Sequence, residues 1–261
     1  MTERRDVAVV GGGVAGLTAG VFTARHGLDT LLLDSEAGTP TGNRPQADDG
    51  DESILKRNAH LENVPGFPAG VDARLFLEML GDQADRAGCD RIQAQVTDAA
   101  LTADGAGFSI ETSGGDNYEA KYLVAATRNT VDYLRGIDGL GFVDREKTFV
   151  ECNECGETGV DGLYVAGRLA EKPYQTAICA GHGAEVAVTL LDDHERPFYH
   201  DWIAPEGYFS GRDRDVPPGC EEIDDAEREA REQESLEVMR EYFADPHPSE
   251  PTQHPSVADD E

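Results

Sequence analysis

The sequence predicts an α/β fold of Rossmann-like type, with a central parallel sheet, helices on both faces, a small antiparallel hairpin layer and a helical C-terminal extension. Three observations predict it. Residues 6–34 have the pattern of a strand, a glycine turn, a helix and a second strand. Residues 121–127 and 163–167 are short apolar runs with the composition of buried strands, and residues 176–191 form a small-residue helical pattern. Short apolar strands that alternate with helices are typical of doubly wound parallel sheets.

The first unit carries a phosphate-binding pattern. Its glycines have the spacing G-x-G-x-x-G at Gly11, Gly13 and Gly16. In such a turn the first glycine permits the bend, the second allows backbone to approach a pyrophosphate, and the third packs the helix on the strand. The dipole of the helix over residues 17–26 favours the same phosphates. Asp34 ends the second strand, where a carboxylate can accept hydrogen bonds from a ribose. We expect dinucleotide binding, with a turn that serves packing only as the alternative.

The middle of the chain continues the alternation. Residues 35–58 are rich in Gly, Pro, Thr and Asp and predict a long loop. Residues 72–87 have apolar spacing near 3.6 and predict an amphipathic helix. Residues 92–96 are a strand candidate. Residues 108–112 and the chain from Tyr118 flank a glycine turn and predict a small antiparallel hairpin.

The character of the chain changes from residue 195. Residues 198–209 concentrate aromatics, including the only tryptophan, and predict an extension packed on an apolar patch, with substrate contact as the alternative. Residues 223–243 predict a charged helix with a narrow apolar stripe that faces a core or a partner. Residues 245–261 are proline-rich and acidic and predict disorder.

Charge excludes one class of partner. The chain has 52 acidic and 22 basic residues and a formal net charge of −30, which repels nucleic acid. Only 15 of the acidic residues fall in residues 221–261, so the excess is general. Four lysines occur against 18 arginines. We therefore predict an acidic, halophilic protein from a salt-rich cytoplasm of haloarchaeal type.

The sequence also predicts a cytoplasmic protein without a membrane partner. Residues 1–5 are polar and precede no apolar signal segment, and no run of 18 apolar residues occurs. The five cysteines are an odd number, which argues against a structural disulfide framework.

Four blocks of sequence, in order, resemble the FAD domain of the thioredoxin reductase-like pyridine nucleotide-disulfide oxidoreductases over roughly residues 5–192. They are the glycine turn at residues 11–16, an E-N-x-P-G-F turn at residues 62–67, a strand of the type that ends in A-T-G at residues 124–127, and the closing strand and helix at residues 162–167 and 174–183. The resemblance implies FAD as the cofactor. The implied organisation is an FAD-binding domain over residues 1–194, a packed aromatic and acidic helical extension over residues 195–244, and a disordered acidic tail over residues 245–261.

The resemblance also implies roles for residues. The glycine turn and Asp34 would hold the ADP half, Asn63 would contact the flavin ring, and the start of the last helix would face the pyrimidine oxygen. The full predicted cofactor-binding set is Gly11, Gly13, Val14, Ala15, Gly16, Asp34, Asn63, Val96, Ala126, Thr127, Arg128, Gly167, Arg168, Gln175, Thr176 and Ala177.

Three departures from the family pattern matter. Only residues 129–160 separate the segments between which the family inserts an NADPH-binding domain with its redox cysteine pair, so both are missing. Arg128 stands where the family has the A-T-G glycine, and Arg168 where it has an aspartate that binds the ribityl chain. The two guanidiniums can engage phosphate in bidentate fashion. Two alternatives stay open: the ligand is held differently, or flavin binding has been lost.

No residue is a secure catalytic acid, base or nucleophile. Cys152 and Cys155 form a C-x-x-C, which can be a redox pair or half a metal site, but they precede the amino end of a strand, far from the ligand edge of such sheets. Structural thiols are therefore the stronger interpretation. His60, just before the E-N-x-P-G-F block, and His182, inside the last block, are either proton donors or packing residues. No metal site is predicted.

The first functional hypothesis is an FAD-dependent oxidoreductase that uses a diffusible donor and acts on NAD(P)H or on a disulfide or dithiol. The redox partner stays open between a small molecule and a protein, and a homodimer is one arrangement. The second hypothesis is a regulatory module that kept the fold and a nucleotide without turnover. A third, weaker one is a bound NAD.

Overall fold

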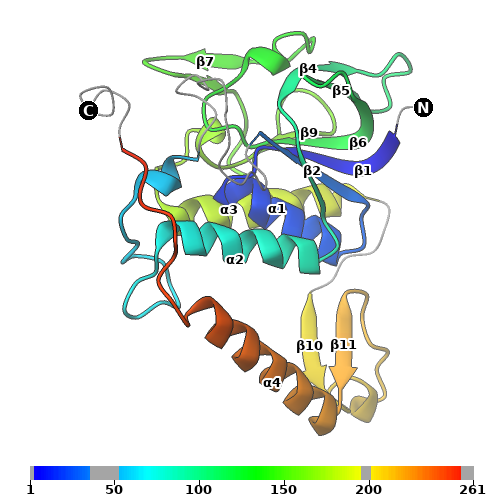
Figure 1. Cartoon of the computed structure of the whole chain (residues 1–261). Coiled ribbons are helices and arrows are strands. Elements are labelled where there is room, and N and C mark those ends of the chain that lie inside the picture. The colour runs from blue at the N-terminus through cyan, green and yellow to red at the C-terminus, as the bar shows by residue number, and fades with distance from the viewer. Residues whose placement is uncertain (1–2, 36–52, 195–200, 254–261) are drawn as a thin grey trace. The chain divides into compact units, whose positions relative to one another are not determined.

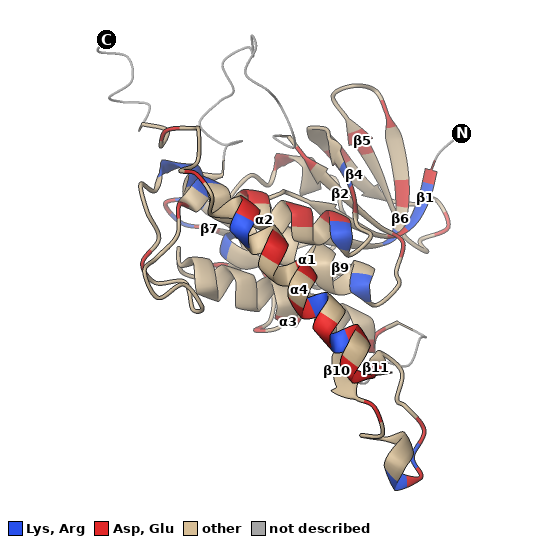
Figure 2. Cartoon of the chain, turned by 60° about the horizontal axis from the view of Figure 1, so that its bottom comes forward, with Lys and Arg blue, Asp and Glu red and all other residues tan. Residues whose placement is uncertain are grey.

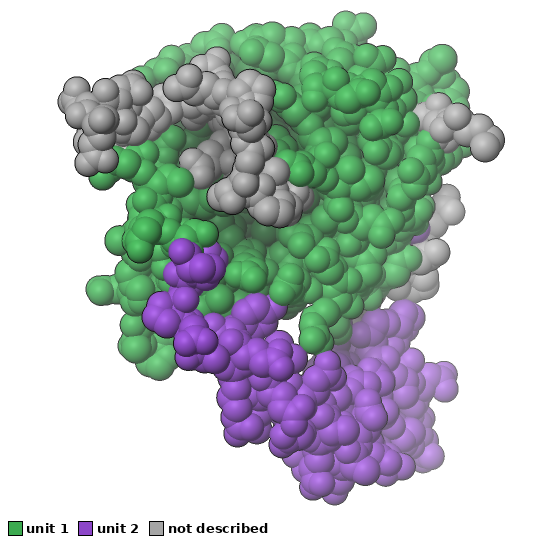
Figure 3. Space-filling view, in the orientation of Figure 1, with its two compact units in different colours: residues 1–190, 249–261 green, residues 191–248 purple. Residues whose placement is uncertain are grey.

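The computed structural model of this chain describes residues 3–35, 53–194 and 201–253. The chain forms two compact units (Figure 3). The first joins Met1–Leu190 with Ser249–Glu261, and the second is Leu191–Pro248. The chain therefore leaves the first unit once and returns to it.

A seven-stranded sheet with the order β3-β2-β1-β6-β5-β4 organises the first unit, and β9 also pairs with β6. Strands β1, β2, β3, β6 and β9 pair in parallel, whereas β4, β5 and β6 pair antiparallel. The strands are β1 (Glu3–Val10), β2 (Thr30–Asp34), β3 (Asp90–Gln93), β4 (Val96–Leu101), β5 (Phe108–Thr112), β6 (Asn117–Ala125) and β9 (Leu163–Val165). The mixed α/β class with a central, mostly parallel sheet is thus as predicted.

Three helices cover one face of this sheet (Figure 1). They are α1 (Val14–Arg25), α2 (Ala73–Arg86) and α3 (Thr176–Asp192), each within a few residues of the predicted range. The opposite face packs on the antiparallel strands and on η2 (Asp132–Leu134), whose Tyr133 and Leu134 belong to the same buried cluster as Leu31, Leu33 and Leu123. Because β-structure and a 3-10 turn fill that layer, no α-helix of the described residues occupies the second face where the sequence predicted one.

Strand β6 is one strand where the sequence predicted two pieces. Its first half, residues 117–120, pairs with β5 as the predicted hairpin, and its second half, residues 123–125, pairs with β9 in the parallel sheet. Strand β1 pairs with both halves on the other edge. The candidate strand at residues 92–96 is in turn divided, because β3 ends at Gln93 and β4 begins at Val96.

Shorter elements complete the first unit: η1 (Ile54–Arg57), η3 (Gly167–Ala170) and an antiparallel pair, β7 (Phe142–Asp144) and β8 (Thr148–Val150). Element η1 lies in the region predicted as a long loop, whose residues 36–52 are outside the described residues.

The second unit contains more than the predicted helix. Strands β10 (Trp202–Pro205) and β11 (Cys220–Ile223) pair in parallel, and η4 (Ser210–Arg212) lies between them in sequence. Helix α4 (Asp225–Tyr242) follows and has no buried residue. Figure 2 shows acidic residues, in red, distributed along it. The predicted aromatic concentration is partly outside the described residues, but Trp202, Tyr208 and Phe209 meet edge to face with ring centroids 4.7 to 5.7 Å apart.

None of the helices in the described ranges combines the length and apolar character that crossing a bilayer requires.

Candidate functional site

The ends of four parallel strands converge on one cavity. β1, β2, β6 and β9 end at Val10, Asp34, Ala125 and Val165, and all four carboxyl ends lie at one edge of the sheet because the strands are parallel. The cavity there has a volume of about 780 Å³ and is lined by residues that follow each of these ends. Ligand pockets commonly range from ~300 to ~1,000 Å³ and occur at this edge of open α/β sheets.

The glycine turn is part of the wall, and its geometry explains the three glycines. Gly11 has φ 110°, and a Cβ there would lie 2.6 Å from the Ala126 carbonyl oxygen. A Cβ on Gly16 would lie 1.9 Å from the Gly11 oxygen, so this glycine lets α1 start directly against the strand. At Gly13 a Cβ would meet nothing within 4 Å, because that face is open space at the cavity. The turn therefore offers bare backbone to a ligand, as a pyrophosphate requires.

Asp34 lies against this turn. A Cβ on the intervening Gly12 would come within 2.1 Å of an Asp34 carboxylate oxygen, so only glycine leaves that carboxylate where it is. Asp34 itself lines the cavity at the end of β2. Its position beside the turn fits the predicted contact with a ribose.

The electrostatics of the cavity differ from those of the chain as a whole. Among the described lining residues three are arginines, Arg57, Arg128 and Arg168, and Asp34 is the one acid. Helix α1 adds its amino terminus, which starts after Gly13 without a side-chain cap and without an acidic residue in its first turn. The described part of the cavity wall is thus basic although the protein has a net charge of −30, and this suits an anionic ligand such as a dinucleotide diphosphate.

Two amide side chains from distant segments join at the wall. Asn63, in the E-N-x-P-G-F turn, donates from Nδ2 to Oε1 of Gln175 over 2.8 Å. Gln175 is the residue directly before α3. Both residues line the cavity, as does Thr176. The structure therefore brings together the blocks from which the sequence predicted the flavin ring contacts.

The two arginines that depart from the family pattern do not fill the cavity. Arg168 lies between the rings of Phe149 and Tyr174, with its guanidinium carbon 4.6 and 4.5 Å from their centroids. It donates to the carbonyl oxygens of Glu171 and Lys172 at 3.3 and 3.2 Å. Arg168 thus orders its own loop while it lines the wall.

Arg128 follows β6 with φ 60°, which is the left-handed conformation that glycine adopts at least cost. Beside it the Thr127 hydroxyl donates to the Thr130 carbonyl at 2.7 Å and lies 3.2 Å from the Tyr133 hydroxyl. Tyr133 is buried, and burial raises the pKa of its phenol. The tyrosine therefore stays neutral in the wall.

Most of the predicted cofactor residues line this cavity, and three do not. Gly16, Gly167 and Ala177 are set back from it. Gly167 has φ 65°, and a Cβ there would lie 2.6 Å from the Cβ of Ala15, so its part is the close approach of η3 to α1. The assignment of individual residues to a bound cofactor stays a prediction.

The four weak catalytic candidates are not among the lining residues. His60 is exposed and lies beside Gly70. His182 is buried, accepts the Gly167 N–H at Nδ1 over 3.0 Å and places Nε2 3.2 Å from the Glu154 carbonyl oxygen, so it braces backbone.

The C-x-x-C lies in a turn organised by its own asparagine. The side-chain oxygen of Asn153 accepts from the amides of Cys155 and Glu157, each at 3.0 Å. Cys152 and Cys155 are free thiols, and burial raises the pKa of Cys152. In the described part of the chain no group of three His, Cys, Asp or Glu side chains could hold a metal ion.

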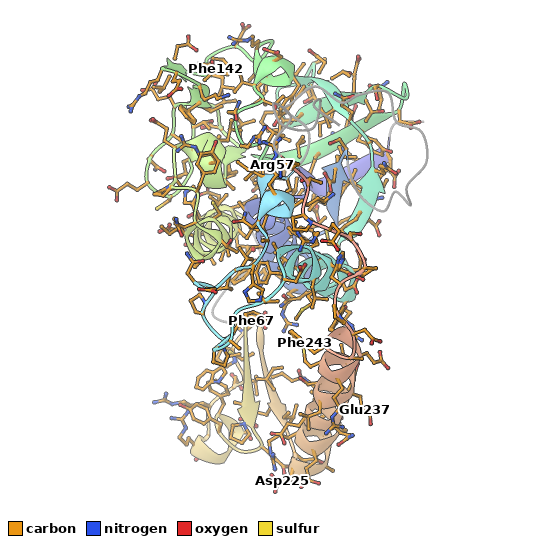
Figure 4. The ribbon with its side chains drawn as sticks, turned by 60° about the vertical axis from the view of Figure 1, so that its left-hand side comes forward. Arg57, Phe67, Phe142, Asp225, Glu237 and Phe243 are labelled. Atoms are coloured by element: carbon orange, nitrogen blue, oxygen red, sulfur yellow. The ribbon has the colours of Figure 1, made fainter. Side chains whose placement is uncertain are left out.

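Sequence reasoning missed several residues of the wall. They are Arg57, Gln95, Tyr133, Tyr174, Thr252 and Gln253, among others. Figure 4 labels Arg57 on η1. Arg57 could have been found as a candidate for binding an anion, because it is a basic residue in a predicted loop of a very acidic chain. Nothing in the local pattern indicated Thr252, because it lies in a proline-rich stretch that returns from the second unit.

Comparison with known proteins agrees with this site. Residues 6–42 match the family model described as an FAD binding domain. The chain is 31% identical over 122 residues to the thioredoxin reductase of Listeria monocytogenes, which covers 47% of this chain and 33% of the relative. It is 30% identical over 127 residues to the thioredoxin reductase of Streptomyces clavuligerus, covering 49% and 35%. The chain thus spans about a third of the length of the curated relatives it matches.

Solved structures show the same fold. A thioredoxin reductase from Gloeobacter violaceus has a TM-score of 0.60 at 17% identity, covering 77% of this chain and 100% of the other. A ferredoxin-flavin thioredoxin reductase from Clostridium acetobutylicum has a TM-score of 0.53 at 17% identity, covering 74% and 99%. The thioredoxin reductase-like resemblance is confirmed, and FAD is the cofactor that the family match and the relatives support.

Proposed function

We propose that this thioredoxin reductase-like chain binds FAD in the cavity at the carboxyl edge of its sheet and acts as an oxidoreductase. A bound flavin would supply the electron-carrying chemistry. The chain's own residues would position it: the glycine turn and the start of α1 at the diphosphate, Asp34 at a ribose, and Asn63 with Thr176 at the ring end.

One observation carries the proposal. Segments far apart in sequence, the turn at residues 11–16 and the block at residues 174–176, line one cavity whose described charged residues are three arginines and one aspartate. A glycine turn that served packing alone would need neither the open face at Gly13 nor the basic lining.

The electron donor in this proposal is diffusible. Between β6 and β9 the chain builds only η2 and the β7–β8 pair, so no second nucleotide domain lies there. The electrons would come from NADH or NADPH that docks transiently, from a ferredoxin-type carrier or from a dithiol substrate. The free thiols Cys152 and Cys155 do not line the cavity and have no part in this proposal.

The first experiment is to identify the ligand and then to reduce it. We expect the purified protein, alone or after incubation with FAD, to show flavin absorbance, and extraction to release FAD. Anaerobic addition of NADH, NADPH, reduced ferredoxin and a dithiol, one at a time, should bleach the flavin with at least one of them. A protein that takes up no FAD contradicts the proposal.

Persistent yellow colour with every donor would instead support the second candidate, a regulatory module that holds FAD without turnover. The loop-ordering contacts of Arg168, where the family has a ribityl-binding aspartate, favour that candidate. Extraction of NAD in place of FAD would support the third hypothesis, a site that holds NAD.

A further inference from the structure

The segment that returns from the second unit forms part of the cavity wall. Thr252 and Gln253 line the cavity, and the Thr252 amide donates to the Lys56 carbonyl oxygen over 3.2 Å. In Figure 1 the red end of the described chain passes beside η1. Residues more than 190 positions apart in sequence are thereby joined at the ligand site.

A buried arginine also holds η1. Arg74, on α2, is only 8% exposed and donates to the carbonyl oxygens of Lys56 and Asn58 at 3.2 and 2.9 Å. Asp72 caps the amino terminus of α2 and pairs with the same guanidinium. The Lys56 carbonyl oxygen therefore accepts from both Arg74 and Thr252, so the returning segment binds a backbone group that a buried side chain also holds.

The Thr252 side chain has an unused hydrogen-bonding group at this wall. Its hydroxyl oxygen is buried and has no hydrogen-bond partner among the residues that the structure describes. A buried hydroxyl without a partner is unfavourable, and such groups in native proteins are usually satisfied by a protein group, water or a ligand. Because Thr252 lines the cavity, a ligand there can supply the partner.

We propose that Thr252 is a ligand-contact residue whose hydroxyl hydrogen-bonds a polar atom of the bound dinucleotide, and that residues 249–253 are a wall of its site. This inference rests on the proposed function, because it takes FAD as the ligand. It adds a fifth chain segment to the four that the sequence blocks supply. It also assigns a binding role to a stretch for which the sequence predicted none.

The test uses two variants of the full chain. Thr252→Val keeps the shape and removes the hydroxyl, whereas Thr252→Ser keeps the hydroxyl. We expect T252V to weaken FAD binding to the apoprotein by about two- to tenfold, the size of one net hydrogen bond, and T252S to stay within about twofold of wild type. Flavin fluorescence gives the dissociation constants. Titrations with ADP and with FMN locate the contact, because the loss appears with the one that contains the contacted half.

The melting temperature of the apoprotein separates this role from a structural one. T252V removes an unsatisfied hydroxyl, so it should leave that temperature unchanged or raise it while FAD affinity falls. Equal FAD affinity in T252V and wild type overturns the inference, as does a variant that loses apoprotein stability and affinity together. A wild-type protein that binds neither FAD nor ADP overturns the proposed function as well.

Discussion

At the scale of single residues, Arg128 shows how a departure from a family pattern is accommodated. The position needs a left-handed backbone, and Arg128 adopts φ 60° to provide it. A residue with a Cβ pays a conformational cost of roughly 1–2 kcal/mol there, which glycine avoids. The side chain that replaces the glycine adds a guanidinium to the cavity wall.

This cost predicts a stability difference between two variants. Arg128→Gly and Arg128→Ala both remove the guanidinium, but only glycine relieves the backbone. We expect the glycine variant to be more stable than the alanine variant by about 1 kcal/mol in urea unfolding of the apoprotein. Equal stability of the two would show that the left-handed conformation costs nothing here.

His182 predicts a dependence of stability on pH. Burial, and next the nearby charge of Lys172, lower the pKa of this imidazole below its ordinary value of about 6.5. The unfolded chain therefore takes up the proton first as the pH falls. The stabilisation is complete above about pH 6.5 and decreases as the pH drops below it.

The matching experiment compares wild type with His182→Gln. The free energy of unfolding should fall more steeply in wild type than in the variant between about pH 7 and pH 5, because the variant lacks this titration. The other histidines contribute equally to both curves. Parallel curves would contradict the role given to His182.

At the scale of elements, α3 approaches α1 as closely as its backbone allows. A Cβ on Gly183 would lie 2.2 Å from the Ala15 carbonyl oxygen, whereas a Cβ on Gly181 would meet nothing within 4 Å. Both glycines lie inside α3, so the two positions differ in packing alone.

These two glycines make a matched pair. Gly183→Ala should destabilise the protein by several kcal/mol or prevent folding, because α3 must move away from α1. Gly181→Ala should stabilise it by about 0.5–1 kcal/mol through the better helix propensity of alanine. Thermal unfolding monitored by circular dichroism measures both, and a destabilising G181A would contradict the open surroundings of that position.

In the second unit, Glu222 holds the turn that carries the aromatic cluster. Its carboxylate accepts from the Ser210 hydroxyl at 2.7 Å and from the amides of Ser210 and Gly207 at 3.0 and 3.1 Å, and it also accepts from the Phe209 amide. Chiefly the Ser210 hydroxyl, and then these amides, lower the pKa of Glu222 to about 2.

Because the folded turn binds the ionised carboxylate, Glu222 stabilises the turn fully at pH values above its ordinary pKa of 4.5. This stabilisation is lost as the pH falls towards about 2. Wild type should therefore be more stable than Glu222→Gln near neutral pH, and the difference should vanish between about pH 4.5 and pH 2. The fluorescence of Trp202, the only tryptophan, reports on this unit. A difference that persisted at pH 2 would count against the carboxylate.

Features that depend on residues close together in sequence could be predicted, whereas features that depend on contacts between distant segments could not. The glycine turn, Asp34 and the helices α1, α2 and α3 depend on local spacing, and the structure has them where that spacing placed them. The β10–β11 pair and the wall residue Thr252 depend on contacts between distant segments, which a single sequence does not display. The same holds for the second face of the sheet, because antiparallel strands fill it in place of a helix.

At the scale of the whole molecule, arginines form ion pairs with some of the many acidic residues. Arg5, whose side chain is 11% exposed, donates to Asp29 and Asp90 at 2.8 and 2.6 Å and also pairs with Glu3. This one guanidinium links the start of β1 to the loop before β2 and to β3. The net charge of −30 nevertheless implies repulsion between acidic side chains across the surface.

Repulsion of this kind predicts that salt stabilises the protein. The Debye length falls from ~10 Å at 0.1 M to ~3 Å at 1 M salt, so like charges on the surface are screened from each other. We expect the melting temperature to rise between these concentrations in sodium or potassium chloride. A melting temperature that stayed constant would contradict the halophilic interpretation of the composition.

The continuity of β6 has a consequence for how the first unit comes apart. One strand belongs to the parallel sheet through β1 and β9 and to the antiparallel layer through β5. Opening of the antiparallel layer would remove the hydrogen bonds of β5 from β6, and β6 also belongs to the parallel sheet whose carboxyl edge forms the cavity. We therefore expect the backbone amides of both layers to exchange with deuterium together, in a single cooperative opening, because the continuous strand β6 belongs to both.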